Sequence, residues 1–171
     1  MAVANTKSTI VTNADALDGT KTNTFVMGGV VREQVATVET AAADDAGSVY
    51  RLFRVHSSWR ISQLLIGHDA VTNMSTADIG IYDIATVNAG AVVDVDFFAD
   101  ALDISSASSG MVDRTYERAN TRISDIQKPL WEQLGLSADP LKWYDIAVTA
   151  TTNDPTAAAT ISGILRYVTN Q

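Results

Sequence analysis

Residues 30–66 read VVREQVATVETAAADDAGSVYRLFRVHSSWRISQLLI, and this stretch decides the fold class. Runs rich in β-branched, aliphatic and aromatic residues alternate here with small polar turn residues, first at Ala43–Gly47 and then at Ser57 and Ser58. Such runs at a spacing of about ten residues are typical of an all-β sandwich or barrel. We therefore predict strands over 30–40, 48–56 and 59–66. In the second strand, alternation predicts Val49, Phe53 and Val55 on one face and Tyr50 and Leu52 on the other.

The same pattern continues toward the C-terminus. Further strands are predicted over 77–84, 91–93, 143–151 and 160–168, and the last two bracket a turn at Asn153-Asp154-Pro155. Because they flank a turn signal, we predict that these two strands pair as a hairpin. Residues 111–123 carry several charged side chains and stay ambiguous between strand and helix.

Two short segments change from strand-like to helical spacing. Val95, Phe98, Ala99 and Leu102 stand at i, i+3, i+4 and i+7, which predicts two turns of helix with Asp94 as the N-cap. Pro129–Leu134 is predicted as a second helix, with proline at a permitted first position and Gly135 as the stop signal. The expected fold is an all-β, antiparallel sandwich with one or two short helices.

The N-terminal segment differs in composition from the rest of the chain. Residues 1–28 are rich in Thr, Asn, Ala and Gly, and their few large apolar groups cannot form a core alone. They form either a partly ordered tail ending in a turn at Asp18-Gly19 or an extended arm that lies on a neighbouring subunit. We divide the chain into an arm, 1–28, and a β-sandwich domain, 29–171. The candidate assembly contacts in the arm are Ile10, Leu17 and Phe25.

Composition excludes several classes of function. A chain of 171 residues with 46% apolar and 19% charged residues has the profile of one globular domain. Twenty acids against twelve bases give a net charge of −8, which argues against binding to a nucleic acid backbone. The absence of cysteine excludes disulfides and thiolate metal sites. No run of 18 apolar residues and no secretory signal pattern occurs, so we expect synthesis in the cytoplasm and no membrane partner.

Polar candidate sites are few. His56, His68 and Asp69 could share a metal, but each histidine is more simply a hydrogen-bonded loop residue. Asp96, Asp100 and Asp103 would form one row on the predicted helix, where a solvated acidic face is favoured over a cation site. The only glutamates are Glu33, Glu39, Glu117 and Glu132, and nothing in the sequence singles out two carboxylates as the catalytic pair of a glycosidase. We expect no catalytic residues, no metal and no cofactor, and therefore not an enzyme.

The three tryptophans, Trp59, Trp131 and Trp143, are the candidates for sugar stacking. Trp131 falls in the second predicted helix and Trp143 begins a predicted strand, so packing in a core or an interface is favoured. A shallow groove that uses Trp59 or Trp143 to bind a sugar is the alternative to packing.

Three segments together resemble a known family. They are VANTKSTIVTNADA at 3–16, ADIGIYDIATVNAGAVVDVDFFADALDIS at 77–105 and LWEQLGLSADPLKWYDIAVTATT at 130–152. They are similar to the capsid cement, or decoration, proteins of tailed bacteriophages such as the short-tailed Bordetella bacteriophage. The similarity spans most of the chain and rests on the general character of these three segments rather than on a catalytic motif. The basic segment 114–122 is not placed by it.

The resemblance implies a jelly-roll-like sandwich on the outside of an HK97-like capsid, where it bridges subunits of the major capsid protein. It makes the chain a structural component of the virion and leaves a tail or fibre module that binds a host glycan as the alternative. Exposed sheet edges and an arm without its own core also predict self-association as a homodimer or homotrimer.

Overall fold

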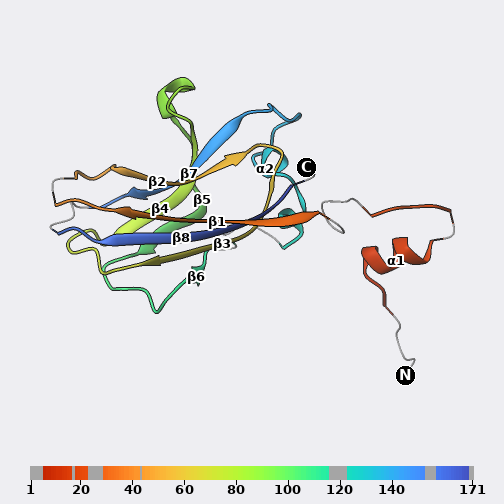
Figure 1. The fold of residues 1–171 in the computed structure, drawn as a ribbon, viewed down its shortest axis with the longest axis horizontal. Helices are drawn as coiled ribbons and strands as arrows, with labels where there is room; N and C mark the ends of the chain where they lie inside the picture. Colours follow the sequence, from red (N-terminus) through yellow and green to blue (C-terminus); the bar gives the residue numbers. More distant parts are fainter. Residues whose placement is uncertain are drawn as a thin grey trace.

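The computed structural model describes residues 6–16, 18–22, 29–42, 44–115, 123–152 and 157–169. In this part of the chain, eight strands form two antiparallel four-stranded sheets that stack as a sandwich (Figure 1). Their order is β1-β8-β3-β6 in the first sheet and β2-β7-β4-β5 in the second. The strands are β1 (Val30–Glu39), β2 (Val49–His56), β3 (Arg60–His68), β4 (Thr76–Asp83), β5 (Val92–Asp103), β6 (Val112–Asp113), β7 (Trp143–Ala150) and β8 (Thr160–Thr169). The helical segments are α1 (Thr9–Asp15), η1 (Asn88–Gly90), η2 (Ile123–Gln127) and α2 (Leu130–Gln133).

The strand order is that of an eight-stranded jelly roll. Except between β4 and β5, each successive strand lies in the opposite sheet, so that β8 returns between β1 and β3. Two sheets wound in this way bury one face of each strand and leave two edges per sheet. The predicted all-β, jelly-roll-like antiparallel sandwich is confirmed.

The hydrophobic core lies between the two sheets. Buried aliphatic and aromatic side chains project inward from strands of both layers and make one continuous cluster. Gly163 of β8 is part of this packing, because a Cβ there would lie 2.7 Å from the Phe53 ring of the opposite sheet. The fully buried members include Ile61, Leu64, Ile66, Ile79, Ile81, Phe98, Tyr144, Ile146 and Ile161.

The predicted helix near Val95–Leu102 is wrong, because these residues belong to the strand β5. Between the pairs Ile79↔Ala99 and Ile81↔Asp94, β4 advances by two residues while β5 advances by five. Further irregularities flank this one, and each bulge shifts the alternation of side chains along the strand. The apolar residues therefore recur at helical spacing although the backbone is extended. Asp94 is a strand residue and not an N-cap.

Two further expectations about strands are wrong. β7 and β8 do not form a hairpin, because β7 pairs with β2 and β4 whereas β8 pairs with β1 and β3 in the other sheet. The turn predicted at residues 153–155 lies outside the described residues. In β2, a bulge between Arg51 and Phe53 brings Tyr50 onto the buried face together with Phe53 and Val55.

The second predicted helix is confirmed as α2, which starts one residue later than expected. Pro129 is its N-cap, with φ −63° and ψ 158°, and Gly135 follows its end with φ +74°. The helix docks on the turn after β2, where the Leu130 N–H donates to the carbonyl of Trp59 over 2.8 Å and Trp131 donates to Ser57. In the ambiguous segment 111–123, Val112–Asp113 forms β6, and residues 116–122 are not described.

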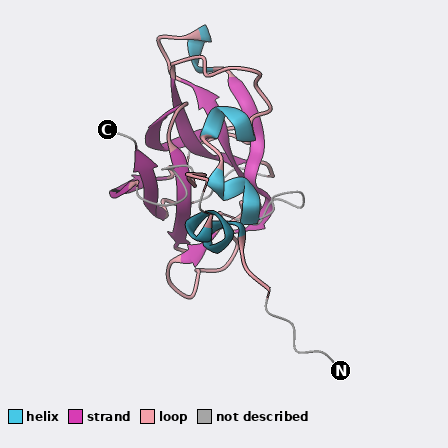
Figure 2. Ribbon diagram, turned by 90° about the vertical axis from the view of Figure 1, so that its right-hand side faces the viewer, coloured by secondary structure: helices cyan, strands magenta, loops and turns pink. Residues whose placement is uncertain are grey.

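The described part of the arm contains a helix that was not predicted. Ser8 caps α1 by accepting a hydrogen bond from the Val11 N–H, and no residue of α1 is buried. The predicted turn at Asp18-Gly19 is present, with Thr20 N–H bound to Asp18 over 2.9 Å and Gly19 at φ +81°. Figure 1 draws α1 apart from the sheets, and Figure 2 looks onto the end of the sandwich that carries α2. The boundary between arm and domain stays a prediction.

Candidate interaction surfaces

The outer face of the β1-β8-β3-β6 sheet carries an apolar row. Val35 of β1, Ile164 of β8 and Leu65 of β3 are directly opposite one another in register. Val35 is 71% exposed, and the other two side chains are half-buried. Because their side chains project to solvent rather than to the core, this row is available to a partner.

Polar side chains flank the apolar row on both sides. On one side, Arg166 donates to Glu33 over 2.8 Å and to Gln63 over 2.7 Å, and Gln63 donates to Asp113 over 3.0 Å. This chain of contacts crosses all four strands of the sheet. On the other side, the hydroxyls of Thr37 and Ser162 lie 3.2 Å apart. The outer face is therefore an apolar stripe between two rows whose polar groups are largely paired.

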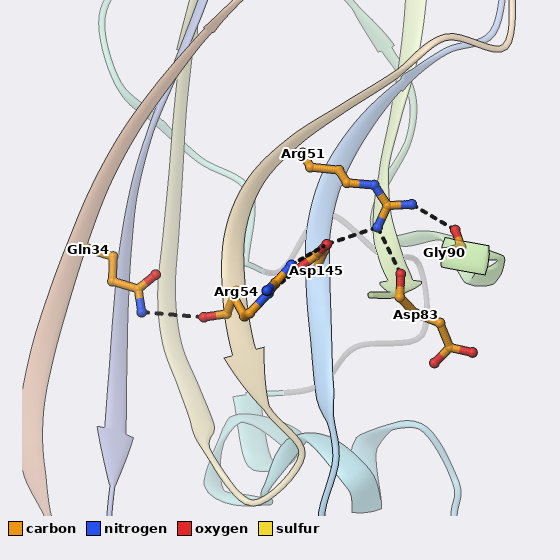
Figure 3. Close-up of polar contacts among 6 residues, drawn as sticks. All are labelled: Gln34, Arg51, Arg54, Asp83, Gly90 and Asp145. Atoms are coloured by element: carbon orange, nitrogen blue, oxygen red, sulfur yellow. Dashed lines mark hydrogen bonds and ion pairs between the residues drawn. The ribbon is translucent and has the colours of Figure 1, made fainter. Parts of the chain in front are cut away.

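A buried carboxylate organises the outer face of the second sheet. Asp145 of β7 is 4% exposed and accepts hydrogen bonds from Arg51 Nη1 at 3.0 Å and Arg54 Nε at 2.9 Å (Figure 3). This contact raises the pKa of the Arg54 guanidinium. At the end of β4, Asp83, which is opposite Tyr144 in register, binds the Lys142 ammonium at 2.8 Å, and this contact raises the pKa of Lys142. The cations are thus neutralised within the chain.

Arg51 also fixes the connection between β4 and β5. Its guanidinium donates to the carbonyls of Asp83 at 2.8 Å and Gly90 at 2.7 Å, one at each end of this loop (Figure 3). Asn88, Ala89 and Gly90 have φ of 49°, 52° and 72°, so three consecutive residues lie in the left-handed region. Left-handed Ala89 costs about 1 kcal/mol, and Arg51 holds the loop in this conformation.

Aromatic side chains cluster at the end of the sandwich that carries α2. Trp59 stacks on Tyr167 with centroids 4.2 Å apart, and Trp143 packs edge-on against Trp59 at 5.3 Å and against His56 at 5.1 Å. Trp143 is 42% exposed. Trp59 and Trp143 therefore come together as a glycan site requires, whereas Trp131 lies on α2.

A nearby loop presents an additional apolar side chain. Leu141 is 75% exposed and has φ +52°. Its N–H donates to Asp139 over 2.9 Å, and the carboxylate of Asp139 also accepts the hydroxyl of Ser57. The loop is thereby tied to the turn after β2. Sequence reasoning missed Leu141, and an isolated leucine after proline gives no signal for such exposure.

The predicted acidic row is not a helix face. Asp96, Asp100 and Asp103 lie on β5, an edge strand, and Asp78 of the neighbouring β4 accepts the N–H of Ala101 at 2.8 Å. Ala101 sits in a bulge with φ +51°, so Asp78 satisfies a backbone donor that the ladder leaves open. Burial raises the pKa of Asp78, and the charges of Asp100 and Asp96 add to this effect.

The other predicted candidates do not converge. His56 and His68 end strands of different sheets, and their Nδ1 atoms contact the Ser58 hydroxyl at 2.8 Å and the Asp69 carbonyl at 3.0 Å. Ile10 is 37% exposed on α1, and Leu17 and Phe25 lie outside the described residues. Glu33 pairs with Arg166, Glu39 accepts from Thr160, Glu132 lies on α2, and Glu117 is not described.

Within the described ranges, no group of three or more His, Asp or Glu side chains is arranged to hold a metal ion. None of the helices described is long and apolar enough to cross a membrane.

Solved structures with the same fold come from bacteriophage capsids. A chain in the structure of the capsid of Ralstonia phage GP4 superposes with a TM-score of 0.61 at 17% identity, over 84% of this chain and 86% of that one. A chain of the cyanophage Pam1 capsid asymmetric unit gives a TM-score of 0.53 at 11% identity, over 83% and 86% of the two chains. No family model and no curated protein matches the sequence. At these identities the likeness establishes the fold.

Proposed function

We propose that this chain is a structural virion protein, a cement or decoration protein that binds the outside of an HK97-like phage capsid and bridges its major capsid subunits. The observation that carries the proposal is the likeness to chains of two phage capsid structures, which extends over more than four-fifths of both partners. Because the coverage is mutual, each neighbour is a chain of about this length. In each case the matched region makes up most of the neighbouring chain and is not an insertion in a much larger one.

The surfaces of the molecule support a binding role. The outer face of the first sheet offers an apolar row framed by paired polar groups, and the second sheet carries the clamped β4–β5 loop. The first surface lies on hydrogen-bonded strands and the second is held by Arg51, so both are formed before a partner covers them and less conformational entropy should be lost on binding. Such preformed surfaces suit a protein that recognises an assembled lattice.

The mechanism of stabilisation is mass action. A protein that binds the assembled shell and not its free subunits shifts the equilibrium toward the shell. If it acts as a homodimer or homotrimer, several weak contacts add to a high avidity. In this proposal, each copy on the outer surface adds interface area that resists the pressure of packaged DNA.

Cosedimentation tests the proposal. Purified protein is mixed with capsids of the encoding phage that have been stripped of it, and saturable cosedimentation with hundreds of copies per shell is expected. Mass spectrometry of intact virions gives the copy number relative to the major capsid protein. Failure to bind stripped capsids, or a handful of copies per virion, would reject the cement role.

A second function is favoured by one observation, the exposed Trp143 beside Trp59 and His56. An exposed indole can stack on the apolar face of a sugar ring, as a tail or fibre module that binds a host glycan would require. A glycan array with the wild-type protein and Trp143→Ala separates the two functions. Glycan binding that is lost in Trp143→Ala, without binding to capsids, would favour the fibre module.

A further inference from the structure

We propose that β1 is the self-association surface of this protein, and that two copies join their β1 edges antiparallel about a two-fold axis at Val35 to form one eight-stranded sheet. The inference deepens the self-association included in the proposed function, but its test in solution does not depend on capsid binding.

Of the four sheet edges, three carry features that discourage pairing. β6 has only two residues, Val112 and Asp113. β5 carries four aspartates and several irregularities of register, and β2 contains a bulge beside Arg51. Short length, charge and bulges are the devices by which sheet edges avoid other strands.

The fourth edge, β1, is neither short nor bulged, and its three charged residues, Arg32, Glu33 and Glu39, are of mixed sign. Its ten residues pair with β8 in one unbroken register from Val30↔Thr169 to Glu39↔Thr160. Val31 and Val35 are 61% and 71% exposed. A long, regular edge with apolar side chains is the kind of strand to which another strand adds.

The direction of the backbone groups follows from the register. The N–H of Thr40 donates to the carbonyl of Ala159 over 2.9 Å, in line with the pairs of β1 and β8. In an antiparallel ladder these bonds recur at every second residue, so even-numbered residues of β1 face β8. The backbone N–H and C=O groups of residues 31, 33, 35, 37 and 39 therefore point away from the sheet. In the described part of the chain, β8 is the only strand that pairs with β1.

Side-chain chemistry selects the axis. An axis at Glu33 would set that carboxylate against its own copy, and one at Ala36 would set Glu33 against Glu39. An axis at Gln34 would set Glu33 against Val35. With the axis at Val35, Val35 faces its own copy and Glu33 faces Thr37, whose hydroxyl can donate to the carboxylate. The one unfavourable pair, Val31 against Glu39, then lies at the ends of the paired strands and not at the centre.

The same axis also joins the outer faces of the two copies. The row Leu65–Ile164–Val35 continues into Val35–Ile164–Leu65 of the second copy, so the exposed apolar stripe becomes continuous across the sheet. The chain entering β1 at Gly29 then stands opposite Ala41 of the second copy. Each arm would thus leave its own domain alongside the neighbouring one.

The test places charges at the axis. Val35→Lys and Val35→Glu are made in the full chain, and mass is measured by light scattering at micromolar concentration in about 0.15 M salt, where screening leaves mainly close contacts. Wild type is expected at twice the 18.2 kDa of one chain. Each variant alone is expected to be a monomer, because like charges would meet at the axis. A 1:1 mixture of the two variants is expected to recover dimers, because the introduced ammonium then faces the introduced carboxylate.

Val92→Lys is the matched control, since Val92 is 55% exposed on the protected edge strand β5 and should leave the dimer intact. Circular dichroism melting verifies that every variant folds. A monomeric or trimeric wild type, folded variants that stay dimeric alone, or a mixture that stays monomeric would overturn the inference. If the wild type is a dimer, each variant alone is a monomer and the mixture recovers dimers, but the wild type does not bind stripped capsids, this inference stands and the cement role is rejected.

Discussion

At the scale of single residues, Asp145 is the polar group whose removal should lower the free energy of unfolding most. It is the carboxylate that Arg51 and Arg54 share, and Arg51 in turn holds both ends of the β4–β5 loop. Asp145→Ala is expected to lower the free energy of unfolding by about 2 kcal/mol, below the usual cost of breaking a buried pair because both guanidiniums keep contact with solvent. Urea unfolding measures the change. Arg54→Ala, whose head is mostly exposed, should cost less than about 1 kcal/mol, and an equal loss in both variants would contradict this account.

Asp78 should have the opposite effect on stability. Because burial raises its pKa above the ordinary 3.8, the folded state holds the proton more tightly than the unfolded state. The free energy of unfolding therefore falls as the pH rises from the ordinary pKa of 3.8 through the raised pKa of the folded state. At neutral pH the ionised Asp78 carboxylate is destabilising. Asp78→Asn keeps an oxygen for the Ala101 N–H, so we expect a higher melting temperature at pH 7 and little change below pH 3.8.

Asp103 provides the control for this pH dependence. Hydrogen bonds from Ser105 lower the pKa of Asp103, so its charge contributes stability that is lost as the pH falls through the lowered pKa. Asp103→Asn is thus expected to lower the melting temperature at pH 7. Thermal scans of both variants across the acidic range compare the signs. A lower melting temperature for both variants at pH 7 would show that Asp78 is not held at an electrostatic cost.

At the scale of elements, the sequence predicted most strands and failed where bulges change the apolar spacing to a helical one. β1, β3 and β4 have continuous strand-like runs bounded by turns, and they were predicted to within about two residues although β3 contains a bulge between Ile61 and Gln63. In β5 the bulges imitate helical spacing, and no local rule separates that pattern from a real helix. The pairing of β7 and β8 is non-local, because both strands take partners remote in sequence. Helix α1 buries nothing, so it left no apolar pattern to detect.

The candidate surfaces were predictable only in part. The tryptophans and the acidic residues of β5 were recognised by residue type, but the proximity of Trp59 to Trp143 depends on how β2 and β7 pair. Val35 looked like any valine of a strand, and its exposure at an edge follows from sheet order alone. Residue type thus identified candidates, and topology decided which of them meet.

The arm is the element whose role can be tested by deletion. Its helix has no buried residue, and its ion pair between Lys7 and Asp15 is local and exposed. Deleting residues 2–24 is therefore expected to leave the melting temperature of the domain nearly unchanged and to weaken oligomer formation or attachment to capsids. Calorimetry and cosedimentation measure the two effects. A truncated protein that no longer folds, or that decorates capsids normally, would show that the arm has another role.

At the scale of the whole molecule, charge and symmetry act together. The chain carries a net charge of −8, and its cations on the second sheet are already neutralised by Asp83 and Asp145. An acidic layer of such molecules keeps particles apart by mutual repulsion. In the proposed cement role, attachment to a shell would then rely on apolar and hydrogen-bonding surfaces, and the proposed two-fold dimer would present each of these surfaces twice.

If the chain is a cement protein, as proposed, the two-fold dimer predicts how it would stabilise a capsid. If the protein binds the assembled shell and not the free subunits, the temperature of capsid disruption should rise progressively with protein concentration. The corresponding free energy of stabilisation is about 2.7 kcal/mol per site at a concentration 100 times the dissociation constant. Because a dimer engages two sites at once, Val35→Lys should need a concentration roughly 100-fold higher for the same effect. Differential scanning calorimetry of stripped capsids, titrated with wild type, Val35→Lys and the Val92→Lys control, measures both quantities. If wild type and Val35→Lys stabilised capsids at equal concentrations, attachment would be monovalent, and the bridging of neighbouring subunits would have to arise within a single jelly roll.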